Sequence, residues 1–122
     1  MAGSLEMITS ATDFAALQAA GRSRSHPLLA LRYRPNGAAR TRFGISTGRR
    51  IGGAVVRNRV RRRLRTVLRQ IAASLPAGWD ILLVCRPPAA TASQAELGAA
   101  LERLLAQAGI SGPATPTEAS TR

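Results

Sequence analysis

The segment between Phe14 and Trp79 carries a dense positive charge that nothing within it offsets, because it contains fifteen arginines and no carboxylate. Within residues 57–65, six of the nine positions are arginine. Such a segment folds only if its apolar residues are buried while its guanidinium groups stay at the surface. The charges repel one another and destabilise a compact state unless an anionic partner covers them. A polyphosphate suits that surface, so the sequence predicts a nucleic-acid partner.

The rest of the composition sharpens this contrast. The chain has 122 residues, enough for one domain, and a net charge of +12, yet all six carboxylates lie outside the basic segment. There is no lysine. A codon usage rich in G and C accounts for its absence, while the forked, planar guanidinium group suits phosphate. Codon usage does not account for the clustering of the arginines.

No set of side chains in the sequence indicates catalysis by the protein itself. Cys85 is the only cysteine, which excludes a disulfide framework, and His26 has no partner residue with metal-ligand spacing. The carboxylates are scattered, so we expect no catalytic residue and no metal site. No apolar run approaches the roughly 20 residues that span a bilayer, and no secretory signal is visible. We therefore expect a cytoplasmic protein without membrane contact.

The spacing of apolar residues predicts an α+β fold, a single four-stranded sheet with helices packed on it, which the family resemblance described below makes a small α/β sandwich. The expected order is α-β-β-β-α-β-α: helix 11–20, strands 22–25, 28–34 and 42–47, helix 53–74, strand 79–85 and helix 95–108. The turn Pro35-Asn36-Gly37 predicts that the strands on either side of it form an antiparallel hairpin. The strand 79–85 is almost entirely apolar, which predicts a central position covered on both faces. We expect one RNA-binding domain over residues 1–110 and a disordered tail over 111–122.

The helix expected over residues 53–74 is amphipathic. Its apolar residues recur every three or four positions and form one stripe: Val56, Val60, Leu64, Val67, Leu68, Ile71 and Leu75. Most of its seven arginines fall on the opposite arc, with no acid in reach along the helix. A solvated charged face normally mixes both signs, and a disordered basic arm or localisation signal has no apolar stripe. An RNA-binding face fits better than these alternatives.

The loop Gly48-Arg49-Arg50-Ile51-Gly52-Gly53 precedes this helix. Its glycines let backbone amides approach an anion, and the start of the helix adds a positive dipole. It lacks the Lys-Ser/Thr pair of a P-loop, and a plain turn is the alternative. Because the arginines of the loop are followed one turn later by Arg57-Asn58-Arg59, we predict phosphate contact here. Asn58 either orients the neighbouring arginines, contacts RNA or is simply an exposed amide.

Three aromatic side chains are candidates for stacking on bases: Phe14, Tyr33 and Phe43. Burial in the core is the alternative for each of them. Tyr33 lies on a strand between Arg32 and Arg34, so the aromatic ring and the two arginines point to opposite faces of the sheet.

These residues together resemble a known family. The run from Phe43 to Arg62, with a strand ending in Phe-Gly-Ile-Ser-Thr, the basic glycine loop and a helix opening with Arg-Asn-Arg, is similar to the signature of the bacterial ribonuclease P protein component. The resemblance implies a sandwich with a left-handed β-α-β crossover. It also implies a protein that joins ribonuclease P RNA one to one and helps it remove the 5′ leader of precursor tRNA. Mg²⁺, held chiefly by the RNA, would activate water.

The resemblance carries site residues over by position. The residues expected to face the catalytic RNA or the precursor tRNA are Arg49, Arg50, Arg57, Asn58, Arg59, Arg61, Arg62 and Arg65. A leader cleft between the sheet and the first helix would be lined by Phe14, with Tyr33 and Phe43 as further aromatic candidates. The chain departs from the family pattern at Gln18, where a second aromatic is frequent, at Gly53 and Arg63, and in residues 1–13, which contain no basic side chain.

Two other functions remain open from the sequence. A structural ribosomal protein shares this size and charge and binds RNA without affecting the cleavage of precursor tRNA. A nuclease acting without RNA would cleave as the pure protein.

Overall fold

Three helices and one four-stranded sheet make up most of this computed structural model, which describes residues 5–110. The elements are α1 (Ala11–Ala20), β1 (Arg22–Ser25), β2 (Leu29–Pro35), β3 (Arg42–Ser46), the 3-10 turn η1 (Arg49–Ile51), α2 (Ala54–Ile71), η2 (Ala72–Ser74), β4 (Trp79–Cys85), η3 (Pro87–Thr91) and α3 (Gln94–Ala108). The predicted α+β class and the predicted order of helices and strands are confirmed. The expected tail over residues 111–122 lies outside the described residues.

The strands lie in the order β1-β2-β4-β3. β2 pairs antiparallel with β1 and with β4, and β3 pairs parallel with β4. The predicted hairpin between the second and third strands is therefore wrong, because β4 lies between them. β4 takes that place because it is apolar on both faces, with five of its seven residues buried.

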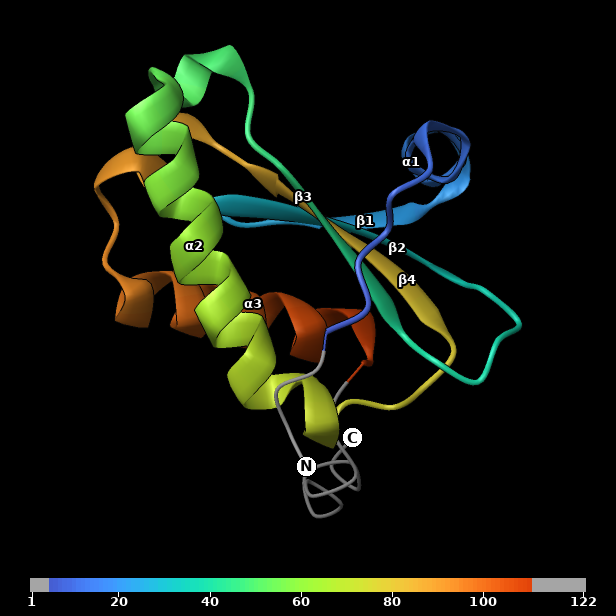
Figure 1. The fold of residues 1–122 in the computed structure, drawn as a ribbon. Helices are drawn as coiled ribbons and strands as arrows, with labels where there is room; N and C mark the ends of the chain where they lie inside the picture. The colour runs from blue at the N-terminus through green and yellow to red at the C-terminus, as the bar shows by residue number, and fades with distance from the viewer. Residues whose placement is uncertain (1–4, 111–122) are drawn as a thin grey trace.

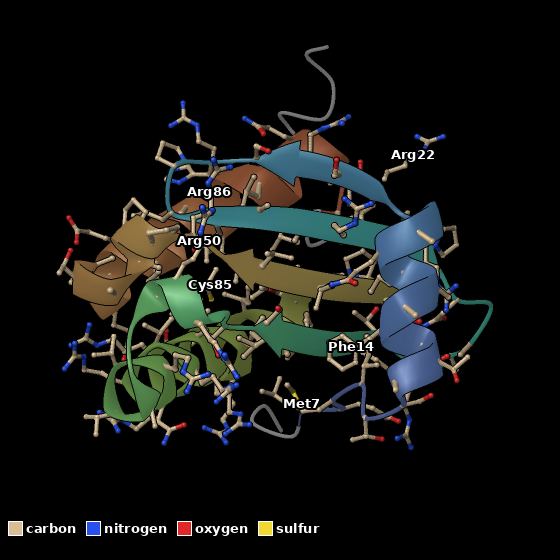
Figure 2. The ribbon with its side chains drawn as sticks, turned by 90° about the horizontal axis from the view of Figure 1, so that it is seen from above. Met7, Phe14, Arg22, Arg50, Cys85 and Arg86 are labelled. Carbon is tan, nitrogen blue, oxygen red and sulfur yellow. The ribbon has the colours of Figure 1, made fainter. Side chains whose placement is uncertain are left out.

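The connection from β3 to β4 runs through η1, α2 and η2, as the long helix between two strands predicted. α1 lies on one face of the sheet, and α2 and α3 lie on the other (Figure 1). Figure 2 looks onto the α1 face; β3 and β4 run to the left, β4 lies above β3, and α2 belongs to the far face. The crossover is therefore left-handed, as the family resemblance implied and against the general preference.

The main core lies between the sheet and the two longer helices. Val60, Leu64, Val67 and Leu68 of α2 are buried in it, together with the leucine stripe of α3. The predicted stripe of α2 is thus the face that meets the sheet. α3 begins with a complete capping box between Ser93 and Glu96.

A second, much smaller core lies under α1, where Ile8, Leu17 and Leu82 are buried. Gly44 on β3 allows α1 to approach closely, because a Cβ at this position would lie 2.9 Å from Cε1 of Phe14. The side chain of Phe14 is half-buried in this contact. α1 therefore rests on few apolar side chains, in contrast to α2.

Candidate nucleic-acid interface

The outer face of α2 is the most strongly charged surface in the described part of the chain. The helix forms because its apolar stripe packs on the sheet, and this packing turns the remaining arc outward. Among the eight predicted RNA-binding residues, Arg49, Arg50, Asn58, Arg62 and Arg65 are exposed, and Arg57, Arg59 and Arg61 are half-buried. The structure thus brings all eight onto α2 and the turn that precedes it.

No carboxylate neutralises this face within residues 5–110. The five ion pairs in that range involve Arg34, Arg40 and Arg42, and none involves an arginine of α2 or η1. Mutual repulsion along α2 is therefore unrelieved in the free protein, and a polyanion bound there would remove it while releasing counterions.

The turn η1 places two arginines beside the start of α2. Ile51 is buried, which fixes the turn to the core, while Arg49 and Arg50 are exposed. Gly52 has a φ of 145°, a conformation that favours glycine, and a Cβ here would lie 3.1 Å from Cβ of Val56. The N-cap Gly53 provides no side-chain cap, so the first amides of α2 are free to meet an anion.

Not every arginine of α2 is equally available. Nη1 of Arg63 donates to the carbonyl oxygen of Ala92 at 2.7 Å, and Nη2 of Arg59 donates to that of Ala90 at 3.4 Å. Both side chains therefore bind the segment that follows β4. Asn58 accepts a hydrogen bond of 3.2 Å from Nη1 of Arg61, which matches the orienting role considered for it.

A second surface lies on the sheet face that carries α1. Strand register places Ser25, Ala30, Val84 and Ser46 in one row across all four strands, and each of them is exposed or half-buried. We call this row the open strip. The neighbouring row lies under α1, where Leu82 is covered and where Arg32 donates to the carbonyl oxygen of Gln18. The open strip therefore runs alongside α1.

Basic side chains and one aromatic ring flank the open strip. Figure 2 shows Phe14 at the α1 end of this face and Arg50 and Arg86 at the opposite end. Arg50 belongs to η1 and Arg86 directly precedes η3, and these two turns contact each other. Beside the strip is a hollow of about 500 Å³ that is lined by Ser25, His26, Pro27, Arg86, Pro87 and Pro88.

The structure corrects two of the three aromatic candidates. Tyr33 and Phe43 are 3% and 2% exposed and belong to the main core, on the face opposite α1. Their strands alternate, so the residues that pair with them in register, such as Ile81, also face α2 and α3. Neither ring can line a cleft between α1 and the sheet. Phe14 alone remains available there.

A buried charge network holds the amino end of α1. Asp80 is fully buried, and it accepts hydrogen bonds from Nε and Nη2 of Arg42 at 2.9 and 2.8 Å and from Asn36 at 2.9 Å. The remaining Nη1 of Arg42 lies 3.3 Å from Oδ2 of Asp13 on α1. Burial raises the pKa of Asp80, but the hydrogen bonds from Arg42 and Asn36 and the charges of Arg42 and Arg34 outweigh it, so the pKa lies below its usual value.

Four further observations concern metal binding, the cysteine, the histidine and membrane crossing. Within residues 5–110, no group of three or more His, Cys, Asp or Glu side chains could hold a metal ion. Burial raises the pKa of the Cys85 thiol to about 12, which makes it a poor nucleophile. Nδ1 of His26 accepts a hydrogen bond from the amide of Leu28 at 3.0 Å. In the described part of the chain, every helix is too short or too polar to cross a membrane.

The sequence reasoning missed three residues that the structure places around these surfaces. Arg86 lies on the side of the open strip opposite α1 and Arg32 in the neighbouring row under α1, and neither is among the predicted site residues. The alternation around Tyr33 could have placed Arg32 on the α1 face. Asp80 had been treated only as a flanking acid, and nothing local in the sequence pairs it with Arg34 and Arg42.

Fold and surface together define a small α+β protein with an unneutralised arginine helix and an open sheet face. Residues 4–109 match the family Ribonuclease P. The ribonuclease P protein component of Herpetosiphon aurantiacus is 37% identical over 103 residues, which cover 84% of each chain. That of Roseiflexus castenholzii is 40% identical over 91 residues, 74% of this chain and 75% of the relative.

Solved structures agree with these sequence matches. The RNase P protein of Staphylococcus aureus superposes with a TM-score of 0.81 at 24% identity, covering 89% of this chain and all of that one, and shows the same fold. The RNase P protein of Thermotoga maritima gives a TM-score of 0.76 at 25% identity, with 84% and 96% covered. The chain belongs to the ribonuclease P protein family. It is a component of an endoribonuclease ribonucleoprotein that processes tRNA. The matches favour this function over the two alternatives, a structural ribosomal protein and a nuclease that acts without RNA.

Proposed function

We propose that this protein binds ribonuclease P RNA through the outer face of α2 and η1 and holds the 5′ leader of precursor tRNA along the open strip. The observation that carries the proposal is the absence of any carboxylate partner for the arginines of α2 and η1 within residues 5–110. A rigid row of guanidinium groups without carboxylate partners in the described part of the chain matches a folded RNA backbone with closely spaced phosphates.

The division between the two RNA surfaces follows from their shapes. The face of α2 is convex and carries charge along its length, which suits the backbone of a large folded RNA. The open strip is floored by small side chains, with Phe14 on the side that faces α1 and Arg50 and Arg86 on the opposite side. A single strand fits it, because a base can stack on the ring and phosphates can meet the arginines.

The protein contributes affinity, and the RNA contributes the chemistry. In this scheme Mg²⁺ held chiefly by the RNA would activate the attacking water. One protein per catalytic RNA, acting in the cytoplasm on newly made precursor tRNA, completes the proposal.

The leader part of the proposal is tested with the protein reconstituted on ribonuclease P RNA. Affinity is measured for a precursor with a long leader and for one with a single leader nucleotide. The proposal expects the protein to tighten binding of the long-leader substrate more than that of the short one, and Phe14→Ala to shrink this advantage. An equal gain in affinity for both substrates would contradict the assignment of the leader to the open strip.

The RNA part is tested by titrating the free protein against ribonuclease P RNA at several salt concentrations. The logarithm of the affinity should fall steeply and linearly with that of the salt concentration. A matched control is an unrelated folded RNA of the same length. Equal affinity for both RNAs at physiological salt would show that the protein binds RNA through charge alone. It would contradict the assignment of the α2 and η1 face to ribonuclease P RNA.

A further inference from the structure

The buried network around Asp80 does more than stabilise the fold, because its geometry also fixes the direction in which Arg42 points. Arg42 uses Nε and Nη2 in a two-pronged contact with Asp80, which fixes the plane of its guanidinium group. That plane sends the third nitrogen, Nη1, toward Asp13 on α1. Asp80 itself is held by Asn36 and lies 3.5 Å from Nη2 of Arg34. A carboxylate in the sheet therefore aims an arginine at the helix.

The helix that this arginine reaches has little else to hold it. Leu17 is the only fully buried side chain in the small core that α1 itself contributes among the described residues. Its two polar contacts with the sheet lie at opposite ends. Asp13 meets Arg42 and Arg34 in the first turn, and the carbonyl oxygen of Gln18 accepts from Arg32 in the last.

The position of α1 in turn decides where Phe14 lies. Phe14 follows Asp13 directly, and its ring rests against Gly44 with no side chain between them. A shift of the first turn would therefore move the ring along the sheet, away from its place beside the open strip. Charge is balanced at this corner, since Asp13 and Asp80 face Arg34 and Arg42, so it offers no excess charge for phosphate.

We propose that Asp13, Arg42 and Asp80 form a positioning device: together they fix the position of α1 over the sheet and thereby determine how tightly the protein binds the leader. None of the three touches the substrate in this scheme; they act through Phe14. This inference rests on the proposed function, because it concerns the same leader site.

The test compares long-leader and short-leader precursors with holoenzyme containing Asp13→Asn. Asparagine keeps the size of the side chain and the backbone amide that donates to Ser10, but it removes the charge that faces Arg42. We expect the long-leader advantage to fall about five-fold, as for the loss of one charge-assisted contact. Affinity for ribonuclease P RNA and kcat on the short-leader precursor should stay unchanged, which unfolding or general damage would not allow.

The matched control is Glu102→Gln, which also removes one negative charge, from an exposed side chain on α3 across the sheet. Either variant raises the net charge by one, and general electrostatics alone would therefore strengthen RNA binding. A weaker long-leader interaction in Asp13→Asn alone has the opposite sign and identifies positioning.

A second variant keeps the net charge constant. Arg42→Lys retains the cation but cannot make the two-pronged contact while reaching Asp13. It should reproduce the loss seen with Asp13→Asn. If both variants keep the full long-leader advantage while Phe14→Ala loses it, the positioning device is refuted and the leader site stands. If the wild-type protein shows no such advantage, the leader site itself is refuted.

Discussion

The guanidinium group of Arg63 donates a hydrogen bond of 2.7 Å to the backbone carbonyl of Ala92, and this contact joins the arginine helix to the segment before α3. Ala92 is 4% exposed with Arg63 in place, so removal of the donor would take away the hydrogen bond that its carbonyl accepts. The contact gives Arg63 a structural task, which Arg59 shares through a longer hydrogen bond of 3.4 Å to the carbonyl oxygen of Ala90.

Arg63→Ala is therefore expected to lower the free energy of unfolding by about 1–3 kcal/mol, the cost of an unsatisfied buried carbonyl. RNA affinity should change little. Arg65→Ala provides the opposite control, because Arg65 is exposed and makes no side-chain hydrogen bond or ion pair within residues 5–110. Urea unfolding and RNA titration of both variants check this; equal stabilities would contradict it.

For an exposed arginine of α2 we predict the reverse, a loss of RNA affinity without a loss of stability. Arg62→Ala should weaken binding of ribonuclease P RNA by about 1–3 kcal/mol and lower the salt slope by about one. Its melting temperature should stay near that of the wild type, because the side chain is exposed. Arg103→Ala removes the same charge from an exposed position on α3 and serves as the reference. Identical losses from the two variants would reduce the effect to net charge.

Acid should weaken the fold through Asp80. Its pKa in the folded protein is depressed below the ordinary value of 3.8, so its contribution is present above that pH and is lost as pH falls through the folded pKa. Asp80→Asn should cost about 1.5–3 kcal/mol at pH 7, because the half-buried Arg42 and Arg34 lose the carboxylate that they face, although Asp13 remains. The stability gap between the two proteins should close as the pH drops below about 4. Denaturant titrations at pH 2–7 measure it, and a constant gap would count against the assignment.

The thiol of Cys85 should be chemically silent in the folded protein. Burial raises its pKa to about 12, so the reactive thiolate is scarce at pH 8 and is also shielded from reagent. A disulfide reagent added at pH 8 should label the native protein only as fast as the protein opens. Labelling in 6–8 M urea, where no structure protects the thiol, sets the reference rate. Native labelling at this rate would show that the thiol is accessible.

The sequence predicted the helices well because their signals are local. The apolar stripe of α2, the Ser93 capping box of α3 and the Gly21 end of α1 each depend on residues close together in the chain. The partners of the strands depend on distant residues. The turn after β2 suggested a hairpin, but the burial of β4 on both faces favoured its insertion, and no short-range pattern encodes that choice.

Some residues of the candidate site could likewise be predicted from local sequence, and others could not. The arginines of α2 could be predicted because one helix displays them, and the alternation around Tyr33 already indicated that the ring and its flanking arginines point apart. The partners of Asp80 could not be predicted, since Arg34 and Arg42 come from two strands that the sequence reading had joined in a hairpin. Arg86 acquires a role only because β3 and β4 end together.

The central place of β4 in the sheet has a consequence for how the protein is made. β3 joins the sheet only through β4, which lies between it and β2, and β4 ends at Cys85, more than two thirds of the way along the chain. A growing polypeptide therefore emerges from the ribosome with its arginine-rich helix synthesised but with no completed sheet to receive it. Folding must wait for late residues, and the nascent cationic segment meets the RNA-crowded cell before its apolar side is covered.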